Sequence, residues 1–65
     1  MLYGIEAYDK LGSEWVFYGY VALFRNWYNA IDYAANRSSE DTYYHVSLIT
    51  EEVAKAGGIY DLLPD

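Results

Sequence analysis

The chain contains no cysteine, a single histidine and only four basic side chains, and each shortage excludes a class of site. Without cysteine there is no disulfide bond and no thiolate metal site, and one histidine lacks the companions that metal sites need. Four Lys and Arg against ten Asp and Glu give a net charge of −6. Because phosphates are neutralised by basic side chains, we expect no direct binding of nucleic acid. The acidity favours a basic partner or serves solubility alone.

Long apolar runs are also missing. No stretch of about 20 apolar residues is present, so we expect no membrane-spanning helix. The beginning of the chain shows no basic segment followed by an apolar core, so we expect no secretory signal and a cytoplasmic location. The 65 residues predict a single domain, residues 1–65, with a small margin of stability.

The alternation of side chains over residues 2–21 predicts two β-strands joined by a turn. Gly12 suits the left-handed position that ends a three-residue loop, residues 10–12, and Asp9 suits the start of the turn. This loop predicts that Asp9 lies opposite Ser13. One face of the hairpin then carries no charge and consists of Tyr3, Ile5, Ala7, Trp15, Phe17 and Gly19. The other face carries two carboxylates among tyrosines and consists of Leu2, Gly4, Glu6, Tyr8, Glu14, Val16, Tyr18 and Tyr20.

The apolar period then changes from two to between three and four, which predicts a helix over residues 26–36 with Asn26 as its N-cap. The apolar stripe of this helix consists of Phe24, Trp27, Tyr28, Ile31, Ala34 and Ala35. Residues 38–41 form a polar loop, and residues 42–49 form a third strand. On that strand Tyr44, Val46 and Leu48 share one face, and Tyr43, His45 and Ser47 share the other.

Thr50 is the expected N-cap of a second helix, with Glu51 and Glu52 in its first turn and an end at Gly57-Gly58. Residues 59–65 are an apolar tail that docks either as a helical turn or as a short strand. The predicted fold is α+β, a small β-β-α-β-α domain. A right-handed crossover places the third strand beside the first, which gives a three-stranded antiparallel sheet of order 2-1-3 with the first helix packed on the uncharged face.

No arrangement of residues predicts catalysis. His45 is interpreted as a half-exposed strand residue, because a metal site or a catalytic base normally has companions. The carboxylates of Glu40-Asp41 and of Glu51-Glu52 diverge, so neither pair is placed for acid–base chemistry. The serines lack a nucleophile motif, and Gly57-Gly58 lacks a following lysine. We therefore expect no enzyme, no catalytic residue, no metal and no cofactor.

The face that the first helix leaves open combines tyrosines with carboxylates. Such a face suits a basic or arginine-rich protein, since arginine stacks on tyrosine and pairs with glutamate. Tyr18 and Tyr20 are the candidate anchors. Alternatively, the tail or a second copy of the chain covers this face, which leaves a monomer or a homodimer as the oligomeric state. The acids can also imitate the spacing of DNA phosphates; the candidates are Asp9, Glu14, Glu40, Asp41, Glu51 and Glu52.

In general character the chain resembles the anti-CRISPR proteins encoded by phages and mobile elements. The resemblance lies in its short cysteine-free length, its acidic residues Glu40, Asp41, Glu51 and Glu52, and its aromatic runs, residues 15–18 and 27–28. It implies an inhibitor in the bacterial host cytoplasm that binds a Cas subunit and blocks access for DNA. The alternative is a structural or regulatory interaction module that self-associates through its tyrosine-rich face.

Overall fold

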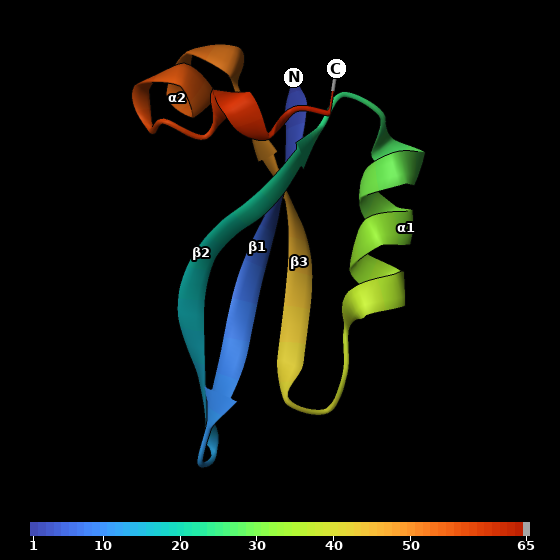
Figure 1. Ribbon diagram of the computed structural model, residues 1–65, viewed down its shortest axis with the longest axis vertical. Helices are drawn as coiled ribbons and strands as arrows, with labels where there is room; N and C mark the ends of the chain where they lie inside the picture. Colours follow the sequence, from blue (N-terminus) through green and yellow to red (C-terminus); the bar gives the residue numbers. More distant parts are fainter. Residues whose placement is uncertain (65) are drawn as a thin grey trace.

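The computed structural model describes residues 1–64 and contains three strands and two α-helices (Figure 1). Asp65, the last residue of the predicted tail, lies outside the described residues. The elements are β1 (Leu2–Leu11), β2 (Glu14–Phe24), α1 (Trp27–Arg37), β3 (Thr42–Ile49), α2 (Glu51–Ala56) and a 3-10 turn (Tyr60–Leu62). The predicted β-β-α-β-α order is therefore confirmed, and the open question of the tail is resolved in favour of a helical turn.

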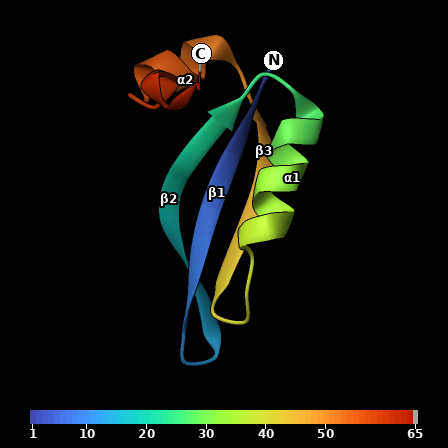
Figure 2. The same cartoon turned by 45° about the vertical axis from the view of Figure 1, so that its right-hand side comes forward.

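The three strands form one sheet of order β2-β1-β3, and β1 is antiparallel to both neighbours, as predicted. Helix α1 runs along one face of this sheet (Figures 1 and 2). Helix α2 and the 3-10 turn lie together at the end of the sheet that is remote from the β1–β2 turn (Figure 1). The face opposite α1 is consequently covered at one end only.

The β1–β2 turn is shorter than predicted. The strand pairing continues to Leu11 opposite Glu14, which leaves Gly12-Ser13 as a two-residue loop instead of residues 10–12. Gly12 does adopt the expected left-handed backbone, with φ 65°, but at the first loop position. Glycine at that position is the requirement of a type II′ turn, whose twist matches that of the flanking strands. The prediction of a three-residue loop was wrong because Gly12 suits both loops.

Two bulges in β2 shift the register further. Tyr8 pairs with Phe17 while Ala7 pairs with Gly19, so Tyr18 has no partner across the ladder. Ile5 then pairs with Ala22 while Glu6 pairs with Tyr20, which leaves out Val21 in the same way. Each extra residue reverses the alternation of side chains along β2. The predicted pairing of Asp9 with Ser13 is replaced by Asp9 opposite Val16.

The corrected register exchanges residues between the two faces. Side chains opposite each other in neighbouring strands share a face, so Trp15 and Phe17 lie with Lys10 and Tyr8 on the face away from α1. Glu14 and Val16, which were predicted there, lie on the other face. The prediction therefore placed Trp15 and Phe17 on the face that α1 covers, whereas both lie on the face away from α1.

Helix α1 begins at the predicted cap: the side chain of Asn26 accepts hydrogen bonds from the backbone N–H groups of Tyr28 (2.8 Å) and Asn29 (3.3 Å). Its buried face is rotated from the prediction. Ala30 and Ala34 are buried, whereas Tyr28 is 78% exposed. Small side chains let the helix approach the sheet closely, and there they cover Ile5, which is fully buried.

A second core lies on the opposite face at the covered end, where Leu2, Leu23, Ile49 and Ala54 pack together. The tail completes it, since Ile59, Tyr60 and Leu63 pack against this cluster. Thr50 caps α2 as predicted, because its hydroxyl accepts from the backbone N–H of Val53 at 3.1 Å. The β3 faces are also as predicted, with Tyr44 and Val46 on the α1 side. Within residues 1–64 no helix has the length and apolar character needed to cross a membrane.

Candidate binding face

Four of the six predicted acidic site residues lie around the β1–β2 turn and the neighbouring α1–β3 loop (Figure 1). They are Asp9, Glu14, Glu40 and Asp41. The two segments are joined by a backbone hydrogen bond from the N–H of Lys10 to the carbonyl of Asp41 at 2.9 Å. The hydroxyl of Thr42 also reaches the carboxylate of Asp9 at 3.5 Å. We refer to these four residues as the acidic end.

The other two acids, Glu51 and Glu52, begin α2 at the opposite end of a molecule that is 35 Å long. Glu51 is engaged in a cluster within the chain. The hydroxyl of Tyr60 donates to its carboxylate at 3.0 Å, and Arg25 pairs with the same carboxylate oxygen at 3.5 Å. Arg25 also donates to the Tyr60 hydroxyl at 2.9 Å. We call Arg25, Glu51 and Tyr60 the Glu51 cluster; the structure separates it from the acidic end.

The two predicted tyrosine anchors have different surroundings. Tyr18 is 73% exposed, stands at a bulge and makes no ring contact with another aromatic residue in the described chain. Tyr20 is half-buried, and its hydroxyl donates to Glu6 Oε2 at 3.1 Å. Gly4 makes this position possible, because a Cβ there would come within 2.8 Å of the Tyr20 ring. Only Tyr20 therefore belongs to an organised group.

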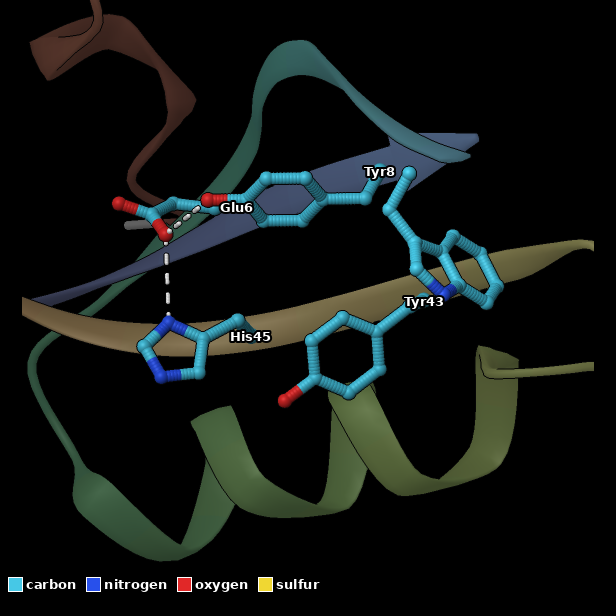
Figure 3. Close-up of a pocket in the computed structure, with 5 residues that line it drawn as sticks. Glu6, Tyr8, Tyr43 and His45 are labelled. Atoms are coloured by element: carbon cyan, nitrogen blue, oxygen red, sulfur yellow. Dashed lines mark hydrogen bonds and ion pairs between the residues drawn. The ribbon is translucent and has the colours of Figure 1, made fainter. Parts of the chain in front are cut away.

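That group surrounds Glu6, which was not predicted as a site residue. Besides Tyr20, the hydroxyl of Tyr8 donates to Glu6 Oε1 at 3.1 Å, and His45 Nδ1 lies 3.2 Å from the same oxygen (Figure 3). The side chain of Glu6 is only 18% exposed, whereas that of His45 is 51% exposed. We call Glu6, Tyr8, Tyr20 and His45 the Glu6 cluster. It is built across all three strands, since β1 lies between the other two.

The Glu6 cluster holds a carboxylate in its charged form. Partial burial alone would raise the pKa of Glu6, but the hydrogen bonds from His45, Tyr8 and Tyr20 outweigh it, so the pKa lies below its ordinary value. The pKa of the Tyr8 hydroxyl is raised, first by its hydrogen bond to Glu6 and then by desolvation. Both shifts describe one arrangement: neutral hydroxyl donors around an ionised carboxylate.

Aromatic rings continue from this carboxylate towards the acidic end. Tyr43 lies 6.1 Å from Tyr8 and 6.2 Å from Trp15, measured between ring centroids, and Tyr8 lies 5.4 Å from Phe17. The exposed fractions of Trp15, Phe17 and Tyr43 are 47%, 52% and 47%. We call the Glu6 cluster together with these three aromatic residues the open face. The Tyr8 ring, Tyr43, His45 and Glu6 converge in Figure 3 around a shallow pocket of about 460 Å³, which Trp15 also lines.

The sequence contained part of this arrangement. Alternation places Glu6 and Tyr8 on one face, and that placement needs only β1. Trp15 and Phe17 were assigned to the wrong face because the loop has two residues and not three, which shifts their register against β1. His45 was expected to be a half-exposed strand residue, and it is, but its partner Glu6 is 39 positions away along the chain. Only the pairing of β1 with β3 brings the two together.

No protein-family model, no curated protein and no solved structure matches the chain. Within residues 1–64 there is also no group of three or more His, Asp or Glu side chains arranged to hold a metal ion.

Proposed function

We propose that this chain is a non-catalytic binding module that holds a basic protein partner against the open face of its sheet. The observation that carries the proposal is a continuous exposed aromatic surface on the face that α1 does not cover. Trp15, Phe17 and Tyr43 are each about half exposed, although they contact one another or Tyr8. Aromatic side chains in such a position contribute little to the core of the module itself.

The composition of the open face is typical of protein interfaces. Tyrosine, tryptophan and phenylalanine are enriched at interface centres, because a large rigid side chain buries much apolar area at a small entropic cost. A monomeric protein seldom exposes a contiguous apolar patch without a use for it. A partner that covers Trp15, Phe17 and Tyr43 would remove this apolar surface from water.

The charge of the module indicates the character of the partner. The net charge is −6, and the acidic end borders the open face on the side of the β1–β2 turn. Complementary charge accelerates encounter and suppresses wrong partners more than it increases affinity. A partner with an apolar centre and a basic rim would fit both features.

The experiment compares which proteins of a bacterial lysate are captured by three immobilised forms of the chain. These are the wild type, Phe17→Ser on the open face, and Tyr28→Ser on the outer side of α1. Both substitutions remove an exposed aromatic ring, so the Tyr28 variant controls for loss of a surface aromatic residue as such. We expect specific proteins to be retained by the wild type and by Tyr28→Ser but lost from Phe17→Ser. Equal retention by all three would overturn the proposal. A homodimer that Phe17→Ser dissociates would replace it with the self-associating module.

A second candidate function is favoured by the acidic end. Asp9, Glu14, Glu40 and Asp41 gather on two adjoining segments, so the chain could instead occupy a basic DNA channel of a bacterial effector such as a Cas protein, as an anti-CRISPR inhibitor would. Reversal of Glu40 and Asp41 to lysine should then abolish capture, and reversal of Glu51 and Glu52, at the far end, should not. Capture would also fall steeply with added salt, whereas capture through the apolar centre of the open face would fall much less.

A further inference from the structure

We propose that the pocket lined by Glu6, Tyr8, Trp15, Tyr43 and His45 binds the guanidinium group of an arginine that the partner presents. The inference rests on the proposed function and specifies the chemistry of the partner at one point of the open face. It follows from a comparison of two tyrosine–carboxylate clusters in the same chain, one of which holds an arginine.

The Glu51 cluster is the occupied example. The Tyr60 hydroxyl donates to Glu51, and Arg25 binds both the carboxylate and the hydroxyl oxygen. The pKa of Glu51 is lowered, first by the hydrogen bond from Tyr60 and further by the charge of Arg25. A carboxylate that already accepts from a tyrosine thus still binds a guanidinium in this protein.

The Glu6 cluster repeats this arrangement without the arginine. Tyr8 and Tyr20 donate to the Glu6 oxygens as Tyr60 donates to Glu51. The only ion pair of Glu6 within residues 1–64 is with His45, which is charged only when it is protonated. A carboxylate offers about four acceptor sites. Tyr8 and His45 both lie at Oε1, Tyr20 donates to Oε2, and the buried hydroxyl of Ser47 lies close to the same carboxylate. The charge of Glu6 is therefore surrounded by hydrogen-bond donors, but within residues 1–64 no permanent cation balances it.

The walls of the pocket suit a planar cation. Rings attract cations over their faces, and arginine in particular stacks flat on them. The chain uses this contact itself, since the guanidinium carbon of Arg37 lies 3.9 Å from the centroid of the Tyr33 ring. Lys10 lies over the Trp15 ring at 5.9 Å, but in the described chain no cation lies over the ring of Tyr43. Tyr43 is central among the pocket rings and is the expected stacking surface.

Charge selects arginine over a neutral group, and shape selects it over lysine. The guanidinium is planar and weakly hydrated, so it loses little on leaving water to lie against a ring beside a carboxylate. An ammonium is compact and strongly hydrated and cannot lie flat against a ring, so it loses more on leaving water. We therefore expect discrimination of several-fold between the two.

The test is an NMR titration of the full chain with three small probes: Nα-acetyl-arginine methylamide, its lysine counterpart, and its citrulline counterpart. Citrulline has nearly the shape of arginine but no charge. We expect the arginine probe to shift the signals of Trp15, Tyr43 and His45 and to bind about tenfold more tightly than the citrulline probe. Equal affinity for arginine and citrulline, or shifts outside the pocket only, would overturn the inference.

Two variants locate the site. Glu6→Gln keeps the shape but removes the charge and replaces one acceptor oxygen with an NH2 donor, and it should weaken the arginine probe about tenfold. Tyr43→Leu removes the ring at an exposed position where folding is little affected, and it should weaken the probe several-fold. Unchanged affinity in folded Tyr43→Leu would overturn the inference even if Glu6→Gln failed to fold.

Failure here remains distinct from failure of the proposed function. If the arginine probe does not bind the pocket while Phe17→Ser still loses its captured proteins, the open face is an interface without an arginine site. If the probe binds while Phe17→Ser captures the same proteins as the wild type, the pocket exists but the partner uses another surface.

Discussion

The Glu51 cluster and the Glu6 cluster use the same chemical pairing for different ends. In each a tyrosine hydroxyl donates to a carboxylate, at 3.0 Å for Glu51 and at 3.1 Å for both tyrosines on Glu6. The Glu51 side chain is half exposed and is balanced by Arg25, whereas the Glu6 side chain is 18% exposed and its one ion pair within residues 1–64 is with His45. The first joins β2, α2 and the tail into one surface; the second leaves a negative charge below an exposed aromatic surface.

Under the proposed function, the two clusters serve different ends: one fixes the chain and the other binds the partner. Exposed ion pairs stabilise a protein little, because water screens them, so the Glu51 cluster mainly fixes where the tail lies. The Glu6 carboxylate is less exposed than that of Glu51 and accepts from two part-buried hydroxyls, so it costs more to assemble and more to break. Glu6 lines a pocket and has no permanent cation beside it, so the cost of holding its charge there fits a role in binding.

The largest effect should come from removing each carboxylate in turn. Glu6→Ala leaves two part-buried tyrosine hydroxyls without their acceptor and should lower the free energy of unfolding measurably. Glu51→Ala removes a solvent-exposed pair and should change that free energy much less. Urea denaturation of both variants checks the comparison. An equal loss in the two would show that the clusters do not differ in the way we describe.

A smaller effect should follow from supplying the missing cation. His45→Lys places a permanent positive charge beside Glu6 and makes this cluster resemble the Glu51 cluster. We expect the arginine probe to bind about fivefold more weakly, because the new ammonium occupies the carboxylate, while the fold is retained. His45→Gln is the matched control, since it donates a hydrogen bond without charge. Equal affinity of His45→Lys and His45→Gln for the arginine probe would contradict the role of charge at this position.

The smallest effect should appear in the acid dependence of stability. The folded-state pKa of Glu6 lies below its ordinary value of 4.5, so its ionised form stabilises the fold above that pH. This contribution is lost as the pH falls from about 4.5 through the folded-state pKa, because protonation then favours the unfolded chain. Glu6→Gln should therefore lose less stability than the wild type over this range. Thermal unfolding at stepped acidic pH measures it, and parallel curves would contradict the lowered pKa.

Most of the fold was determined locally and could be predicted from the sequence. The side chains of Asn26 and Thr50 cap the two helices at the predicted positions, and both caps need only a few neighbouring residues. The strand Thr42–Ile49 has the predicted bounds and faces. The order of the sheet followed from the handedness of a single crossover connection.

The tertiary structure alone decided which side chains meet on the open face. The sequence determined that Gly12 would turn the chain. The two-residue loop placed Trp15 and Phe17 on the open face, and the bulge at Tyr18 placed Tyr20 on the same face. The alternation of side chains along the sequence does not show where a bulge falls. The bulges depend on what β2 packs against, since Ala22 packs against α1 and Leu23 packs against α2 and the tail. The surroundings of Glu6 were thus determined by residues far from it in the sequence, such as Tyr20 and His45, and its sequence neighbours alone did not determine them.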